Sequence, residues 1–285
     1  MTKCGCTECK KQQIGSAGTV LDALAGPGRT VLSVDPGFVM YRMIARFTGM
    51  NYAATALRAT DFGLDAGALL EEIRRTEPAL VFLAVPNNPT GNVFDEADVT
   101  SIIRAAPGLV VIDEAYFEYV SEPDYPNAVQ WVGEFPNLLV TRTFSKAYGL
   151  AALRIGYGVS QAPLADILNR VRQPFNVNSF ALAAALAALA DQDHLAASVQ
   201  ANRAGMQQLV AGLRALRLDF IPSVGNFVAV DVRRDAGRVY EQLLREGVIV
   251  RPVENYAMPG YLRISIGLEE ENRRALEALE RVLAL

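Results

Sequence analysis

Histidine and cysteine are scarce in this chain of 285 residues, and their positions limit the chemistry available to it. The one histidine, His194, lies in a polar stretch typical of the start of a helix. A histidine-rich metal site is therefore excluded, and an enzyme built on this chain would have to move protons with another residue type. The three cysteines, Cys4, Cys6 and Cys9, all lie near the amino terminus. Their spacing allows a soft metal, but three ligands without a fourth favour the alternative of a disordered, reduced tail, and we expect no metal site.

Long apolar runs and an excess of basic residues are also missing. The longest apolar run that suits a helix is FALAAALAALA at 180–190, which is too short to span a bilayer. The first residues, MTKCGCTECKK, lack the apolar core of a signal peptide. The net charge is −4, and no basic block stands out. We therefore expect a cytoplasmic protein with neither a membrane nor a nucleic acid as partner.

The composition and the apolar runs indicate a folded α/β protein. Hydrophobic residues make up 51% of the chain, enough for a sizeable core. Continuous apolar runs, typical of strands that are covered on both faces, occur at 30–34, 79–85, 109–113, 138–143 and 155–160. Helical patterns lie between them at 36–48, 65–76 and 95–105, and Asp65 is placed to cap the second of these. This alternation predicts a mostly parallel sheet with helices packed on it.

The pattern changes after about residue 175. Helices are predicted at 179–190, 193–217, 235–246 and 268–284, and strands at 226–232, 247–253 and 261–267. This order suggests a smaller α+β domain. We therefore expect an atypical segment at 1–28, a large domain at 29–175 and a small domain at 176–285.

Three polar clusters follow predicted strands of the first half. They are PNNPTGN at 86–92, IDEAYFEY at 112–119 and FSKAYGLAALR at 144–154. Taken alone, the first is readable as a turn, the second as a helix cap and the third as a surface loop. Ligands of open α/β sheets bind at the carboxyl ends of strands, so we expect the three clusters to meet at one site.

The third cluster holds Lys146 among apolar side chains, with no acidic residue within ten positions on either side. Partial desolvation favours the neutral amine, which is the form that attacks an aldehyde. Without the other clusters, a solvated surface lysine would be the preferred interpretation. With them, Lys146 is the candidate nucleophile.

Together these motifs resemble the fold-type I aminotransferases, which use pyridoxal 5'-phosphate, and most closely the histidinol-phosphate aminotransferases. The motifs that carry the resemblance are Asn88-Pro89-Thr90-Gly91, Asp113-Glu114-Ala115-Tyr116, Ser145-Lys146 with Arg154, and Tyr261-Leu262-Arg263-Ile264. The resemblance runs from about residue 26 to the end of the chain. It implies an aspartate-aminotransferase-like large domain with a mostly parallel sheet, a smaller C-terminal α+β domain, and a homodimer with its active sites at the subunit interface.

The resemblance also implies roles toward the cofactor. Lys146 would carry it, and Asp113 would be the fixed anion that keeps its ring nitrogen protonated. Asn88 and Tyr116 resemble the donors to the ring's 3-oxygen, although a core aromatic is the alternative for Tyr116. Phe38 matches the aromatic residue that stacks on the ring. The expected phosphate ligands are Thr143, Ser145 and Arg154.

For the substrate, the resemblance implies an amino donor and a 2-oxo acid acceptor, with histidinol phosphate and 2-oxoglutarate as the favoured pair. Arg263 resembles the arginine that binds the substrate's carboxylate or phosphate. Arg251 matches a second anion-binding arginine, with a surface salt bridge as the alternative. Asn226 lies where the family keeps a polar residue near the substrate. Another amino acid, aromatic ones included, is the alternative substrate.

The beginning of the chain departs from the family pattern. Relatives carry an amino-terminal arm that reaches the substrate, a tyrosine given to the partner subunit, and a glycine-rich turn for the cofactor phosphate. Here the stretch Gly15–Thr19 is either a remaining phosphate nest or a plain loop. The sequence therefore predicts a truncated or altered amino terminus. A non-catalytic remnant that still binds the cofactor stays open as an alternative function.

Overall fold

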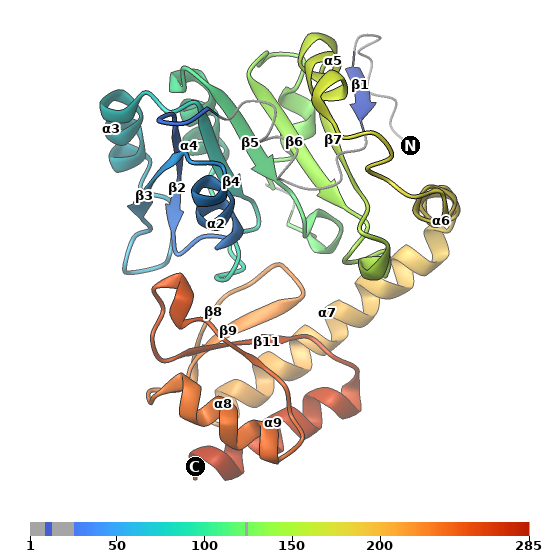
Figure 1. Ribbon diagram of the computed structural model, residues 1–285. Coiled ribbons are helices and arrows are strands. Elements are labelled where there is room, and N and C mark those ends of the chain that lie inside the picture. Colours follow the sequence, from blue (N-terminus) through green and yellow to red (C-terminus); the bar gives the residue numbers. More distant parts are fainter. Residues whose placement is uncertain (1–8, 13–25, 123–124, 285) are drawn as a thin grey trace.

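The computed structural model describes residues 9–12, 26–122 and 125–284. Two β-sheets organise them, one above the other in Figure 1. The seven-stranded sheet has the order β1-β7-β6-β5-β4-β2-β3. Its strands are β1 (Cys9–Gln12), β2 (Thr30–Asp35), β3 (Asn51–Ala56), β4 (Leu80–Ala84), β5 (Leu109–Asp113), β6 (Leu138–Thr143) and β7 (Gly156–Gln161). Strands β2 to β6 run parallel, and β7 and β1 are antiparallel to their neighbours, so the predicted mostly parallel sheet is confirmed.

The register of the central strands places their carboxyl ends side by side. Ala84 of β4 lies opposite Asp113 of β5, and Asp113 lies opposite Thr141 of β6. All five predicted strands of this half are present. Two edge strands were not predicted. The sequence of β1 is polar, and the disordered tail expected around Cys9 is wrong for this residue, because Cys9–Gln12 pair with β7. The NYAATA sequence of β3 is only half-buried and lacks a continuous apolar run.

Helices cover both faces of this sheet, as parallel strands require. They are α2 (Met40–Phe47), α3 (Ala66–Thr76), α4 (Glu96–Ala105) and α5 (Ala162–Val171), and a fifth helix, α6 (Ser179–Ala190), follows them in the chain. Successive residues of β4 point to opposite faces of the sheet. Leu83 packs with α3 and α4 on one face, and Phe82 packs with α2 and α5 on the other. The Asp65 side chain accepts a hydrogen bond from the amide of Ala68 at 2.9 Å, which confirms the predicted cap. Helix α2 begins later than predicted, because residues 36–39 form the connection from β2.

The second sheet has four antiparallel strands in the order β10-β11-β9-β8. These are β8 (Asp219–Ile221), β9 (Phe227–Asp231), β10 (Arg251–Pro252) and β11 (Tyr261–Ser265), and its helices are α7 (Gln192–Ala215), α8 (Ala236–Arg245) and α9 (Glu269–Leu283). The predicted strand at 247–253 shortens to Arg251–Pro252, and β8 was not predicted. Helix α7 runs from α6, beside the first sheet, down to the second (Figure 1).

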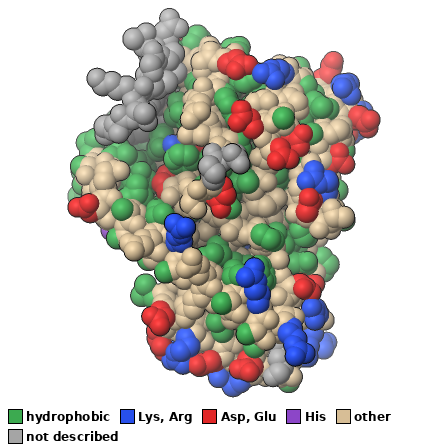
Figure 2. Space-filling view, turned by 180° about the vertical axis from the view of Figure 1, so that it is seen from behind, with side chains coloured by type: hydrophobic (Ala, Val, Ile, Leu, Met, Phe, Trp, Pro, Cys, Tyr) green, Lys and Arg blue, Asp and Glu red, His purple; other side chains and the backbone are tan. Residues whose placement is uncertain are grey.

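Helix α6 packs on the segment between β6 and β7 of the first sheet, although the expected boundary at 175 assigns it to the small domain. Its Ala181 and Ala185 are buried against Phe144, Tyr148 and Ile155. The outer faces of α8 and α9 are charged, and side chains of both signs crowd the lower part of the molecule in Figure 2. Within the described residues, no helix is both long and apolar enough to cross a membrane.

Candidate active site

A pocket of about 180 Å³ lies at the carboxyl ends of β4, β5 and β6, on the side that faces the second sheet. Its lining is Phe38, Ala84, Pro86, Asn88, Asp113, Ala115, Tyr116, Lys146, Arg251, Tyr256 and Arg263. The three polar clusters of the first half therefore meet here, together with residues of the second sheet. The predicted residues that the structure brings together are Phe38, Asn88, Asp113, Tyr116, Lys146, Arg251 and Arg263.

Asp113 closes β5 and presents a half-buried carboxylate to this pocket. Its Oδ2 accepts a hydrogen bond from the Tyr41 hydroxyl at 2.9 Å, and its Oδ1 accepts one from the Thr141 hydroxyl at 3.3 Å. Burial raises the pKa of Asp113, while the two hydroxyls, the Ala115 amide and the charge of Lys146 act in the opposite direction. The site thus holds a carboxylate whose ionisation depends on the donors around it.

Lys146 follows β6 and has the environment that the sequence predicts for a reactive amine. Its pKa is lowered first by burial and then by the positive charges of Arg263 and Arg154, against the attraction of Asp113. Its Nζ lies 5.3 Å from the centre of the Tyr116 ring. Lowering the pKa raises the share of neutral amine, which is the nucleophilic form.

Arg263 connects the second sheet to the Asn88 turn. Its Nη1 donates a hydrogen bond to Oδ1 of Asn88 at 2.6 Å, and its guanidinium lies 4.9 Å from the centre of the Phe227 ring. Its Nε is buried and has no partner among the described residues. An unpaired buried donor of a guanidinium is costly, so this atom is well suited to an anionic ligand. Tyr116 packs edge-on against Phe227 at 5.1 Å, and burial raises the pKa of Tyr116 to about 12.

Arg251 places a second guanidinium at the same pocket. It lies directly opposite Arg263 in the β10–β11 pairing. Its guanidinium is 5.9 Å from the centre of the Tyr256 ring, which also lines the pocket. Arg251 is exposed, so it is the more accessible of the two charges. The pair makes this side of the pocket attractive to anions.

The Asn-Pro-Thr-Gly turn brings the two sheets together beside the pocket. Gly91 has φ +80°, and a Cβ built on it would lie 2.1 Å from Oγ of Ser223. The amide of Val224 donates to the carbonyl of Gly91 at 2.9 Å. Only glycine allows this approach, so the turn also fixes the position of Asn88 relative to the second sheet.

The predicted phosphate ligands lie beside the pocket and do not line it. The Ser145 amide donates to Oγ1 of Thr143 at 3.0 Å. Arg154 is exposed and has φ +53°, and its Nη1 donates to the Ala151 carbonyl at 2.9 Å and to Oγ of Ser145 at 3.5 Å. The three side chains form a polar group next to Lys146 at the end of β6.

Other predictions fall outside this site. Asn226 does not line the pocket, and its carbonyl accepts a hydrogen bond from the Ile266 amide at 2.9 Å. The stretch Gly15–Thr19 lies outside the described residues, as do Cys4 and Cys6. In the part of the chain that is described, no group of three or more His, Cys, Asp or Glu side chains is placed to hold a metal ion.

Sequence reasoning missed three residues at or beside the site, which are Tyr41, Thr141 and Tyr256. Each looks like an ordinary core or strand residue in the sequence. Their positions follow from the packing of α2 on the sheet, from the register of β6 with β5, and from the approach of the second sheet. No local sequence pattern distinguishes them.

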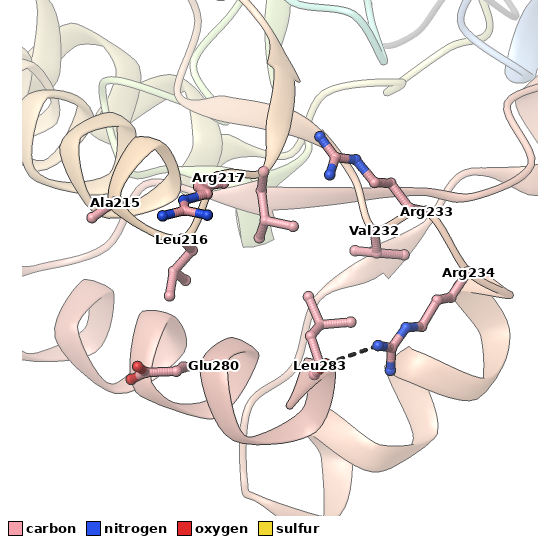
Figure 3. Close-up of a pocket in the computed structure, with 9 residues that line it drawn as sticks. Ala215, Leu216, Arg217, Val232, Arg233, Arg234, Glu280 and Leu283 are labelled. Carbon is pink, nitrogen blue, oxygen red and sulfur yellow. Dashed lines mark hydrogen bonds between the residues drawn. The ribbon is translucent and has the colours of Figure 1, made fainter. Parts of the chain in front are cut away.

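A larger cavity, of about 680 Å³, lies at the far end of the second sheet (Figure 3). Two of its three arginines already have protein partners. Arg233 pairs with Asp219 at 2.6 Å, and Arg234 donates to the Leu283 carbonyl at 2.9 Å. Its lining offers neither a lysine nor a buried carboxylate, so the pocket at Lys146 is the better candidate for amine chemistry.

Comparisons with known proteins agree with this geometry. Residues 14–279 match the family model "Aminotransferase class I and II". The chain is 53% identical over 268 residues to histidinol-phosphate aminotransferase 2 of Pseudomonas fluorescens, covering 93% of this chain and 71% of that protein. It is 49% identical over 262 residues to histidinol-phosphate aminotransferase 1 of Nitrosococcus oceani, covering 91% and 70%.

Solved structures show the same fold. One is the histidinol-phosphate aminotransferase of Sinorhizobium meliloti in complex with pyridoxal-5'-phosphate, with a TM-score of 0.87, 29% identity and coverage of 96% of this chain and 77% of that one. Another is a mutant aspartate aminotransferase of Thermus thermophilus, with a TM-score of 0.85, 27% identity and coverage of 96% and 80%. Both are aminotransferases, and they share the arrangement of the two sheets.

Proposed function

Because the chain belongs to the class I and II aminotransferase family, we propose that it transfers the amino group of histidinol phosphate to 2-oxoglutarate, with pyridoxal 5'-phosphate as cofactor. The observation that carries this proposal is the meeting of a half-buried carboxylate, Asp113, and an amine of lowered pKa, Lys146, in one small pocket. The reaction is a step of histidine biosynthesis, as the names of the relatives indicate. A homodimer in the cytoplasm is the expected form of the enzyme.

The donor set of the pocket fits the proposed cofactor. When bound, pyridoxal phosphate supplies an aldehyde that condenses with amines and a ring that withdraws electrons. Asp113 would hold the proton on the ring nitrogen, and Asn88 and Tyr116 would bind the 3-oxygen. Phe38 would stack on the ring. Thr143, Ser145 and Arg154, next to Lys146, would bind the phosphate.

Lys146 then has two tasks. Its neutral amine would hold the cofactor covalently before the substrate arrives, and the released Nζ would be the base that moves the proton during amino transfer. The lowered pKa serves both tasks, because both need an unprotonated amine near neutral pH. The Tyr116 ring beside Nζ limits where the amine can move.

The two arginines select an anionic substrate. The buried Nε of Arg263 has no partner among the described residues, and a phosphate or carboxylate oxygen would satisfy it. Arg251, opposite it in the sheet, would bind a second oxygen of the same group. Asn226 would act near the substrate only through a shift from its present position, since it does not line the pocket.

The cofactor test uses the full chain, whose few lysines make the site of cofactor attachment easy to identify in a peptide map. Only four lysines occur, Lys3, Lys10, Lys11 and Lys146. With pyridoxal phosphate, the protein should show a visible absorbance band, and borohydride reduction should fix the cofactor on Lys146 in a peptide map. The other three lysines are internal controls. Absence of the band, or label spread over all four lysines, would refute the proposal.

The substrate test compares catalytic efficiencies. The kcat/KM for histidinol phosphate should exceed that for phenylalanine or tyrosine, because only the first carries a phosphate for the arginine pair. Preference for an aromatic amino acid would favour the alternative aminotransferase. Cofactor attachment without any turnover would favour a non-catalytic remnant.

A further inference from the structure

Tyr41 is a buried tyrosine of α2 whose position is fixed on both sides of its ring. It is 1% exposed. Its ring stacks on Phe82 of β4, with the centres 4.5 Å apart and the planes at 18°. Phe38, the aromatic residue at the pocket wall, meets it edge-on at 5.4 Å. Packing alone would explain a phenylalanine here, so the hydroxyl needs a reason of its own.

The hydroxyl of Tyr41 donates to Oδ2 of Asp113 at 2.9 Å. The other carboxylate oxygen, Oδ1, receives the longer bond of 3.3 Å from Thr141. Each oxygen is thus held by a different element, α2 or β6, and the shorter bond is that of Tyr41. A carboxylate held at both oxygens cannot rotate freely, although each oxygen can still accept a further proton donor from the pocket.

The charge state of Asp113 depends on these donors. Burial raises its pKa, and the groups that oppose this rise are Tyr41, Thr141, the Ala115 amide and the charge of Lys146. Tyr116 is the other titratable group near it, and its pKa is also raised. Burial and the neighbouring Asp113 raise the pKa of Tyr41 as well, so its hydroxyl stays protonated and able to donate at neutral pH.

We infer that Tyr41 is a positioning residue that keeps Asp113 ionised and oriented toward the ring nitrogen of the cofactor. This inference rests on the proposed function. Tyr41 does not line the pocket, so it would act on the cofactor only through Asp113. Through its edge contact with Phe38, the same side chain holds the ring-stacking wall and the ring-nitrogen partner in one arrangement.

The experiment measures cofactor affinity in Tyr41→Phe, which removes the hydroxyl and keeps the ring. The matched control is Tyr52→Phe, a tyrosine of the same core cluster whose hydroxyl interacts with Ser33 and Arg42. The dissociation constant of pyridoxal phosphate is measured from the visible band at several pH values. Urea denaturation of the cofactor-free variants shows whether they fold.

Tyr41→Phe should weaken pyridoxal phosphate binding by about tenfold, the effect of one hydrogen bond to a charged group. The loss should be larger at acidic pH, where a carboxylate without this donor protonates first, and should shrink as the pH rises. Tyr52→Phe should bind like the wild type. In an Asp113→Asn background, Tyr41→Phe should have no further effect on affinity, because the charge that it serves is gone.

Two outcomes would overturn the inference. One is unchanged affinity in a folded Tyr41→Phe protein, and the other is the same loss at every pH and in the Asp113→Asn background, which a purely structural role predicts. A wild-type chain that fails to bind pyridoxal phosphate at all would instead refute the proposed function. The two failures are therefore distinguishable.

Discussion

Glu118 should make the stability of this protein fall as the pH rises, and a single substitution should remove the effect. It lies in the short 3-10 helix Phe117–Tyr119, directly after the Asp113 motif. Its Oε2 is buried and has no hydrogen-bond partner among the described residues. The nearby Arg142 is already committed, since it pairs with Glu114 at 2.6 Å and donates to Asn127 at 3.0 Å. Glu118 is therefore half-buried, and its buried Oε2 has no counter-charge of its own.

The magnitude follows from the pKa. Burial raises the pKa of Glu118 from 4.5 to about 7. Between these two values the folded protein holds a proton that the unfolded chain has lost, so the free energy of unfolding decreases as the pH increases through this window. The full effect is about 3 kcal/mol, at 1.36 kcal/mol per unit of pKa. This loss of stability is absent below pH 4.5 and complete above a pH of about 7.

Glu118→Gln keeps the shape and cannot ionise. Urea denaturation at a series of pH values gives the free energy of unfolding of both proteins. At pH 8 the variant should be more stable than the wild type by about 3 kcal/mol, and near pH 4.5 the difference should approach zero. Glu122→Gln, an exposed glutamate in the same part of the chain, should show no such pH-dependent difference. A Glu118→Gln difference that stays constant from pH 4.5 to 8 would refute the reasoning.

Three further predictions concern stability and the arginine site. Glu114→Gln should lower the free energy of unfolding by about 3–5 kcal/mol, because it leaves Arg142 buried without its partner, and a loss under 1 kcal/mol by urea denaturation would contradict this. Gly91→Ala should lower the free energy of unfolding by at least about 1 kcal/mol more than Gly28→Ala, because both glycines have positive φ but only the Cβ at Gly91 would clash with Ser223. Equal midpoints of urea denaturation for the two variants would contradict this. Arg263→Lys keeps the charge and loses the fork that reaches Asn88, so KM for histidinol phosphate should rise about tenfold in steady-state kinetics, and an unchanged KM would argue against a direct role.

Local sequence determined most of the secondary structure of this protein. Continuous apolar runs identified five strands of the first sheet, because strands buried on both faces leave no room for polar residues. The Asp65 cap could also be predicted from the sequence, because it depends only on a backbone amide three residues away. The edge strand β3 and the short β8 escaped, because half-buried or very short strands leave a weak periodic signal.

The sequence also indicated the chemistry of the site, because polar residues after buried strands must gather at one edge of a parallel sheet. Only the tertiary structure decided how these residues act on one another. The bond between Tyr41 and Asp113 joins residues far apart in the chain and depends on how α2 packs on β4. The contact of Arg263 with Asn88 exists only because the second sheet approaches the first. Desolvation, which shifts the pKa of Lys146 and Asp113, is a property of that packing and has no counterpart in the local sequence.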